Sequence, residues 1–170
     1  EQHYYEAINN YQITKYNTSD ADKAIAEKAV EILKADLAKG YDHIVMARCK
    51  NKARANEVYK IYQQYQDYDP VIVYSGMPNA IGTLKAIKEK KHRIIVCVNM
   101  LGEGYDLPQL KIAAIHDERQ SLAVTLQFIG RFTRTNDIKL GKASFITNIA
   151  YPPIKEEVNS LYQIDADWNY

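Results

Sequence analysis

Residues 93–108 read RIIVCVNMLGEGYDLP and pass from an apolar run to a glycine-containing loop. The run over 93–98 lacks polar–apolar alternation, which is typical of a strand buried on both faces of a parallel sheet. Gly102 and Gly104 allow positive φ angles and close approach of the backbone to a ligand. Because open α/β sheets bind ligands at the carboxyl ends of their strands, the loop is a candidate binding site. The alternative is an ordinary turn in which Asp106 is hydrogen-bonded locally.

Short apolar runs alternate with longer amphipathic segments along the rest of the chain. Strands are expected at 43–48, 71–74, 93–98, 111–116 and 142–148, and helices at 21–39, 51–66, 79–91 and in the second half of 121–132. This alternation predicts βαβ units and an α/β fold with a mainly parallel sheet and right-handed crossovers.

Three parts of the chain differ in pattern. Residues 1–19 have no clear period and are expected to be a linker or an edge strand leading into the domain. Residues 20–150 hold the alternating elements and form the expected domain. Residues 151–170 are expected to be a C-terminal helical extension, with a helix signal at 154–162.

A second motif, QFIGRFTR at residues 127–134, places two arginines three positions apart. On a helix Arg131 and Arg134 share a face. Guanidinium groups are planar, permanently charged and suited to bidentate binding of phosphate. The pair is therefore a candidate clamp for a transferring phosphoryl group. A solvated basic helix face is the alternative.

Composition excludes some classes of function and leaves others open. The net charge is +1, so no global field indicates nucleic acid, although a local basic groove remains compatible with it. Cys49 and Cys97 are expected to be small core residues, and no metal site is expected. There is neither a signal peptide nor an apolar run long enough to span a membrane, so a reduced cytoplasmic compartment is expected. The start without Met suggests an excised fragment.

Together the two motifs resemble motifs V and VI of superfamily 2 helicases and translocases. Their order and separation fit a GxD loop followed by QxxGRxxR, and the matching residues are Gly104, Asp106, Gln127, Gly130, Arg131 and Arg134. The resemblance covers roughly residues 41–148 and implies the second RecA-like lobe, a three-layer α/β/α domain. The branch that looks closest contains type III restriction subunits and repair helicases. A threonine that many relatives carry before the GxD loop is replaced here by Val98, with Asn99 following it.

The resemblance implies roles for the motif residues. Arg131 and Arg134 would face the γ-phosphate across the cleft between two lobes, with Arg134 as the arginine finger. Gln127 would link nucleotide and water. Gly104 and Asp106 would contact the ribose or couple the nucleotide to the nucleic acid. Gly130 would permit close packing at the helix start.

The other half of an ATP site is not found in the sequence. There is no GxxxxGK[ST] loop and no strand followed by an acidic pair that would bind Mg²⁺. Residues 116–119, HDER, lie between the two motifs and are rejected as a DExH-like motif; a solvated strand end is expected. ATP with Mg²⁺ would therefore be bound mainly by a missing N-terminal lobe, and the isolated lobe is expected to hydrolyse no ATP.

Candidate nucleic-acid contacts follow the ends of predicted strands: Arg48, Lys50, Ser75, Gly76 and Asn99. A solvated helix start is the alternative for the basic residues near position 50. By resemblance the partner is nucleic acid, with DNA favoured over RNA. The chain has 14 tyrosines, a few of which are candidates for stacking on bases.

Three functions remain in competition. The first is the second motor lobe of an ATP-dependent helicase or translocase. The second is a stand-alone RecA-like module that docks onto a partner without ATPase activity of its own. The third is another α/β enzyme that binds a nucleotide or sugar phosphate, for which no histidine or cysteine has an evident catalytic partner.

Overall fold

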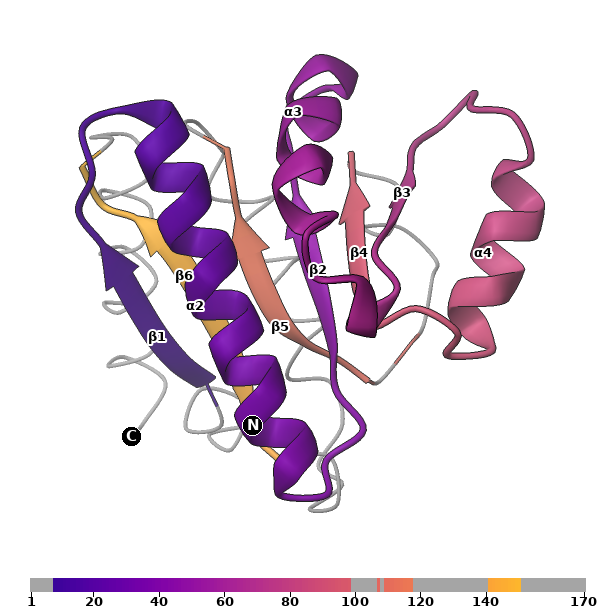
Figure 1. The fold of residues 1–170 in the computed structure, drawn as a ribbon, viewed down its shortest axis with the longest axis horizontal. Coiled ribbons are helices and arrows are strands. Elements are labelled where there is room, and N and C mark those ends of the chain that lie inside the picture. The colour runs from indigo at the N-terminus through magenta and orange to yellow at the C-terminus, as the bar shows by residue number, and fades with distance from the viewer. Residues whose placement is uncertain (1–7, 99–106, 108, 118–140, 151–170) are drawn as a thin grey trace, which may run out of the picture.

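The computed structural model describes residues 8–98, 107, 109–117 and 141–150, which form a parallel sheet flanked by helices (Figure 1). The six strands lie in the order β1-β6-β5-β2-β4-β3. Their bounds are β1 Ile8–Ile13, β2 Ile44–Arg48, β3 Val71–Val73, β4 Ile94–Cys97, β5 Leu110–Ile115 and β6 Ala143–Asn148. The expected α/β fold with a parallel sheet is confirmed.

Three α-helices and a short 3₁₀ helix connect the described strands: α2 Thr18–Ala38, α3 Lys52–Tyr62, η1 Gln66–Tyr68 and α4 Ala80–Lys88. The two longer helices begin at asparagine caps. Asn17 accepts a hydrogen bond from the Asp20 amide, and Asn51 accepts one from the Arg54 amide, which satisfies amides that have no partner within the helix. The expected helix at 121–132 and the one at 154–162 lie outside the described residues.

The direction of each crossover decides which face its helix covers. The connections β1-α2-β2 and β2-α3-β3 run the same way across the sheet, whereas β3-α4-β4 runs back. Right-handed crossovers therefore place α2 and α3 on one face and α4 on the other. The two buried clusters agree: Val45 of β2 packs with α2 and α3, whereas Met46 packs with Ile87 of α4.

The lead-in contributes an edge strand to the sheet. β1 pairs in parallel with β6, in a register that runs from Ile8 opposite Ala143 to Ile13 opposite Asn148. Beyond the strand, Asn148 accepts a hydrogen bond from the Lys15 amide at 3.0 Å and donates one to the Lys15 carbonyl at 2.8 Å. Of the two expectations for this segment, the edge strand is therefore the one found for residues 8–13.

The order of the strands locates a switch point. From the central β2 the chain builds β3 and β4 on one side of it and β5 and β6 on the other. The connections that leave the adjacent strands β2 and β5 therefore run in opposite directions, and ligands of open α/β sheets bind beyond the carboxyl ends of strands at such a point. Within the described ranges, no helix is long and apolar enough to cross a membrane.

Candidate functional site

Three adjacent strands, β5, β2 and β4, send their following segments out from the same edge of the sheet. Lys50 follows β2, the segment with the GxD loop follows β4, and the segment with the arginine motif follows β5. The residues of those two motifs lie outside the described residues, as does Asn99: Gly104, Asp106, Gln127, Gly130, Arg131 and Arg134. Their roles remain predictions.

Arg48, at the end of β2, is buried rather than solvated. It is 6% exposed, and its Nη1 donates to Asp117 Oδ2 at 3.2 Å. The Arg48 carbonyl also accepts the His116 amide at 3.0 Å, which joins β2 to β5 at the switch point. The solvated helix start is therefore wrong for Arg48, whereas Lys50 is exposed.

Ser75 and Gly76 follow β3 at the same edge and are both exposed. Gly76 has a φ of +84°, a backbone conformation that residues with a side chain rarely adopt and that glycine adopts readily. The neighbouring Tyr74 meets Lys52 of α3, whose Nζ lies 4.9 Å from the centre of the ring. Lys50, Ser75 and Gly76 thus lie on two loops that touch each other through Tyr74 and Lys52.

The expectation of a solvated strand end at residues 116–119 is wrong for the two of these that are described, because His116 and Asp117 are each 2% exposed. His116 Nδ1 lies 3.0 Å from Asp22 Oδ1, and His116 Nε2 lies 2.8 Å from the Tyr62 hydroxyl. Side chains of α2 and α3 cover this strand end, so the His116 ring is hydrogen-bonded to side chains instead of water.

Arg54 completes the buried cluster. Its two terminal nitrogens donate to Asp22 at 2.9 and 2.8 Å, and Nη2 also donates to the His116 carbonyl at 3.1 Å. Burial works to raise the pKa of Asp22, but the hydrogen bonds from His116 and Arg54 outweigh it and lower the pKa below its usual range. The hydrogen bonds to Asp22 raise the pKa of Arg54 further above its already high value. The pair is therefore charged.

His116 is held neutral in this cluster. Burial lowers its pKa below the ordinary value, although the hydrogen bond to Asp22 works in the opposite direction. A neutral imidazole that donates from Nδ1 to Asp22 and accepts at Nε2 from the Tyr62 hydroxyl satisfies both contacts. A histidine beside an aspartate resembles a catalytic pair, but both nitrogens are occupied and the ring is shielded from any substrate. The third candidate function, an α/β enzyme of another class, therefore gains no support from this histidine–aspartate pair.

Asp22, Arg54 and Tyr62 were missed as polar anchors, although a local signal was present. Asp22 shares a helical face with the buried Ile25 and Ala26, at spacings of three and four. Arg54 and Tyr62 bracket Val58 at the same four-residue spacing on α3. A charged residue on an otherwise apolar face indicates a buried partner.

The two cysteines behave as expected of small core residues. Both are buried without a disulfide, Cys49 in the cluster under α2 and α3 and Cys97 in the cluster under α4. Burial raises the pKa of Cys97 to about 12 and also raises that of Cys49. Among the described residues, no three His, Cys, Asp or Glu side chains lie close enough together to hold a metal ion.

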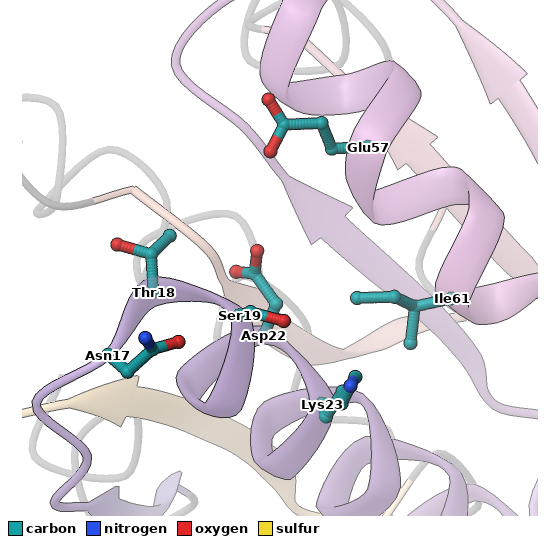
Figure 2. A pocket seen from close by; sticks show the side chains of 7 residues that line it. All are labelled: Asn17, Thr18, Ser19, Asp22, Lys23, Glu57 and Ile61. Carbon is teal, nitrogen blue, oxygen red and sulfur yellow. The ribbon is translucent and has the colours of Figure 1, made fainter.

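A pocket of about 480 Å³ opens between the first turns of α2 and the facing side of α3 (Figure 2). Glu57 and Ile61 project from α3 toward α2. The lining residues are Asn17, Thr18, Ser19, Asp22, Lys23, Glu57 and Ile61. Arg54 binds both carboxylates of the lining, Asp22 and Glu57, so the pocket borders the buried cluster.

The parallel sheet, its strand order and the helices on both faces are those of a RecA-like domain. Residues 25–136 match the family described as the helicase conserved C-terminal domain. The chain belongs to this family.

Known relatives and solved structures agree with that assignment. The ATP-dependent RNA helicase SUB2 of Lodderomyces elongisporus is 27% identical over 117 residues, which are 68% of this chain and 27% of that protein. S. cerevisiae Dbp5 bound to RNA and ADP BeF3 superposes with a TM-score of 0.70 at 15% identity, over 94% of this chain and 39% of that one. The C-terminal domain of the DEAD-box protein Dbp5 superposes with a TM-score of 0.67 at 15% identity, over 96% of this chain and 88% of that one.

These matches correct two expectations. The preference for DNA over RNA is wrong, since SUB2 is an RNA helicase and the Dbp5 structure contains RNA. The branch of type III restriction subunits gains no support from them, because none of the proteins named above is a restriction subunit and Dbp5 is a DEAD-box protein. The coarser assignment, the second RecA-like lobe of a superfamily 2 helicase, is confirmed.

Proposed function

We propose that this chain is the second motor lobe of an ATP-dependent RNA helicase of the DEAD-box type. The observation that carries the proposal is the placement of three segments on adjacent strands. Lys50 follows β2, and the two motif segments start from its neighbours β4 and β5. One edge of the sheet thus serves both the nucleotide and the nucleic acid, as coupling between them requires.

The arginine motif is proposed to act on ATP that a first lobe binds with Mg²⁺. Arg134 would stabilise the charge that develops on the γ-phosphate, with Arg131 beside it and Gln127 orienting water. Gly104, Asp106 and Gly130 would shape the nucleotide side of this lobe. ATP would draw the two lobes together, and hydrolysis would release them.

RNA would lie along the exposed part of the same edge. Lys50 is proposed to bind a phosphate, and Ser75, Gly76 and Asn99 to offer a hydroxyl, a backbone amide and a side-chain amide to the same strand. Phosphate contacts position a nucleic acid without reading its sequence, which suits a motor that moves along its track.

The test is RNA-stimulated ATP hydrolysis by the full-length protein, wild type against Arg134→Ala and Arg134→Lys. A lost arginine finger lowers kcat by about 10³–10⁵ in related systems. Lysine keeps the charge but not the planar fork, so Arg134→Lys should recover little. Lys34→Ala, an exposed position on α2, is the matched control and should change nothing.

The outcomes separate the two main candidates. A large fall in kcat with RNA affinity retained supports the motor lobe and its finger together. Unchanged hydrolysis in Arg134→Ala contradicts the role of that arginine. If the wild-type protein shows no stimulated hydrolysis, the stand-alone docking module becomes the better account.

A further inference from the structure

The contact between Lys52 and Tyr74 spans the end of one strand. Lys52 opens α3 after β2, and Tyr74 directly follows β3. Because β4 lies between β2 and β3 in the sheet, the contact crosses the carboxyl end of β4. The aromatic ring thus lies at the edge where the proposed RNA contacts gather.

The charge of this part of the edge is positive. Residues 48–54 and 74–77 contain four basic residues and no acidic one. Arg48 and Arg54 are engaged by Asp117 and Asp22 from other elements, whereas the two lysines, Lys50 and Lys52, are exposed. A local basic surface attracts a polyanion even when the net charge of the chain is close to zero.

Both partners of the contact are held by local hydrogen bonds. The Tyr74 amide donates to Met77 Sδ at 3.3 Å, and the Met77 amide donates to the Tyr74 carbonyl at 3.3 Å, so the turn after β3 is closed. Lys52 is the first residue of a capped helix, next to Asn51. The surface beside the contact is open at Gly76, where nothing apart from the adjacent residues lies within 4 Å of the position that a Cβ would take.

We infer that Tyr74 and Lys52 form a platform for one nucleotide of single-stranded RNA, in which a base stacks on the Tyr74 ring and Lys52 binds a neighbouring phosphate. The inference rests on the proposed function. It adds an aromatic contact, which binds a base by its face and is therefore tolerant of sequence. A duplex buries those faces in its own stack, so the platform favours single strands.

The relative strengths of the two contacts support an exchange. Stacking of a base on an aromatic side chain changes affinity by about 5- to 150-fold. An exposed cation–π contact changes affinity by only about two- to fivefold. A base therefore displaces the Lys52 ammonium from the ring, and the flexible lysine is released to a phosphate.

The experiment compares two oligonucleotide probes: single-stranded oligouridylate and the same chain with abasic residues, which keeps the phosphates and lacks the bases. Binding to the full-length protein is measured by fluorescence anisotropy with a non-hydrolysable ATP analogue, over a series of salt concentrations. The variants are Tyr74→Ala, Tyr74→Phe and Lys52→Ala. The controls are Tyr16→Ala, which removes an aromatic ring that is 88% exposed, and Lys60→Ala, at the far end of α3.

Tyr74→Ala should weaken binding of oligouridylate about tenfold, leave binding of the abasic probe unchanged and keep the slope of log K against log salt. Tyr74→Phe should bind like wild type. Lys52→Ala should reduce that slope by about 0.7, the value for one phosphate contact on a single strand.

Two results overturn the platform. One is a Tyr74→Ala variant that binds oligouridylate as well as Tyr16→Ala does. The other is an equal loss on both probes, since that makes Tyr74 a packing residue. In either case the proposed function stands if RNA still stimulates hydrolysis. If the wild-type protein binds neither probe, the proposed function and the platform fall together.

Discussion

Arg54 and Asp22 face each other from two helices, with Nη1 2.9 Å from Oδ2 and Nη2 2.8 Å from Oδ1. The two side chains are only 10% and 5% exposed. Each also contacts His116 at the end of β5, the guanidinium through the carbonyl and the carboxylate through the ring. The pair therefore ties α2, α3 and the switch point of the sheet together.

Arg54→Ala is expected to lower the free energy of unfolding by about 3–5 kcal/mol, because it leaves a buried carboxylate without its counter-charge. Urea denaturation measures the loss. The control is Lys90→Ala, which breaks an ion pair of the same 2.8 Å length to Asp42, where the side chains are 41% and 37% exposed. That change should cost less than about 1 kcal/mol. Equal losses in the two variants would contradict a special role for the buried pair.

The order of the elements was predictable because its causes are local. Strands such as β4 are unbroken apolar runs, and α3 starts beside an asparagine cap. Element boundaries shifted where the cap lay outside the expected range: α2 begins at Thr18, three residues early, because Asn17 caps it. Local pattern fixes element type, whereas a terminal turn depends on one side-chain hydrogen bond.

The pairing within the polar cluster was not predictable, because the partners lie far apart in the sequence. Asp22 is hydrogen-bonded to Arg54, which is 32 residues away in the sequence, and to His116, which is 94 residues away. Arg48 is hydrogen-bonded to Asp117, which is 69 residues away, across the switch point. A basic residue at a strand end is solvated by default, and only the order of the strands brings a counter-charge beside it. Lys50, by contrast, is exposed to solvent, as that default predicts.

Substitution of glycine by alanine should lower the stability by different amounts at two glycines with positive φ. Gly76 has a φ of +84° with open space where a Cβ would stand, so Gly76→Ala should lose about 1–2 kcal/mol from backbone strain alone. Gly141 has a φ of +68°, and its Cβ would stand 2.9 Å from the Tyr41 ring. That ring is stacked on His43, with centroids 5.2 Å apart, and cannot move away freely.

Gly141→Ala should therefore cost more than Gly76→Ala, which urea denaturation of the two variants decides. Tyr41→Ala in the Gly141→Ala background should recover part of the difference, because it removes the clash and leaves the strain. A Gly141→Ala variant no less stable than Gly76→Ala would show that the ring yields without cost.

The stability of the lobe should fall on mild acidification because of His116. Burial lowers the pKa of His116 below its ordinary value of 6.5, so the unfolded chain binds a proton more readily than the folded chain does. The contribution of His116 to the free energy of unfolding is complete above pH 6.5. It is lost as the pH falls below that value, with a slope of at most about 1.4 kcal/mol per pH unit. The lowered pKa of Asp22 adds a second loss, which begins only near its ordinary value of 3.8.

Urea denaturation across the range from pH 8 down to about pH 5 separates the contributions of His116 and Asp22, since of these two residues only His116 has an ordinary pKa within that range. His116→Gln lowers stability at every pH, but it should flatten the slope because glutamine does not titrate. The other histidines are present in both proteins, so the difference between the two slopes belongs to His116. An unchanged slope in His116→Gln would mean that the imidazole takes up its proton equally in the folded and unfolded chain, which contradicts a buried neutral ring between Asp22 and Tyr62.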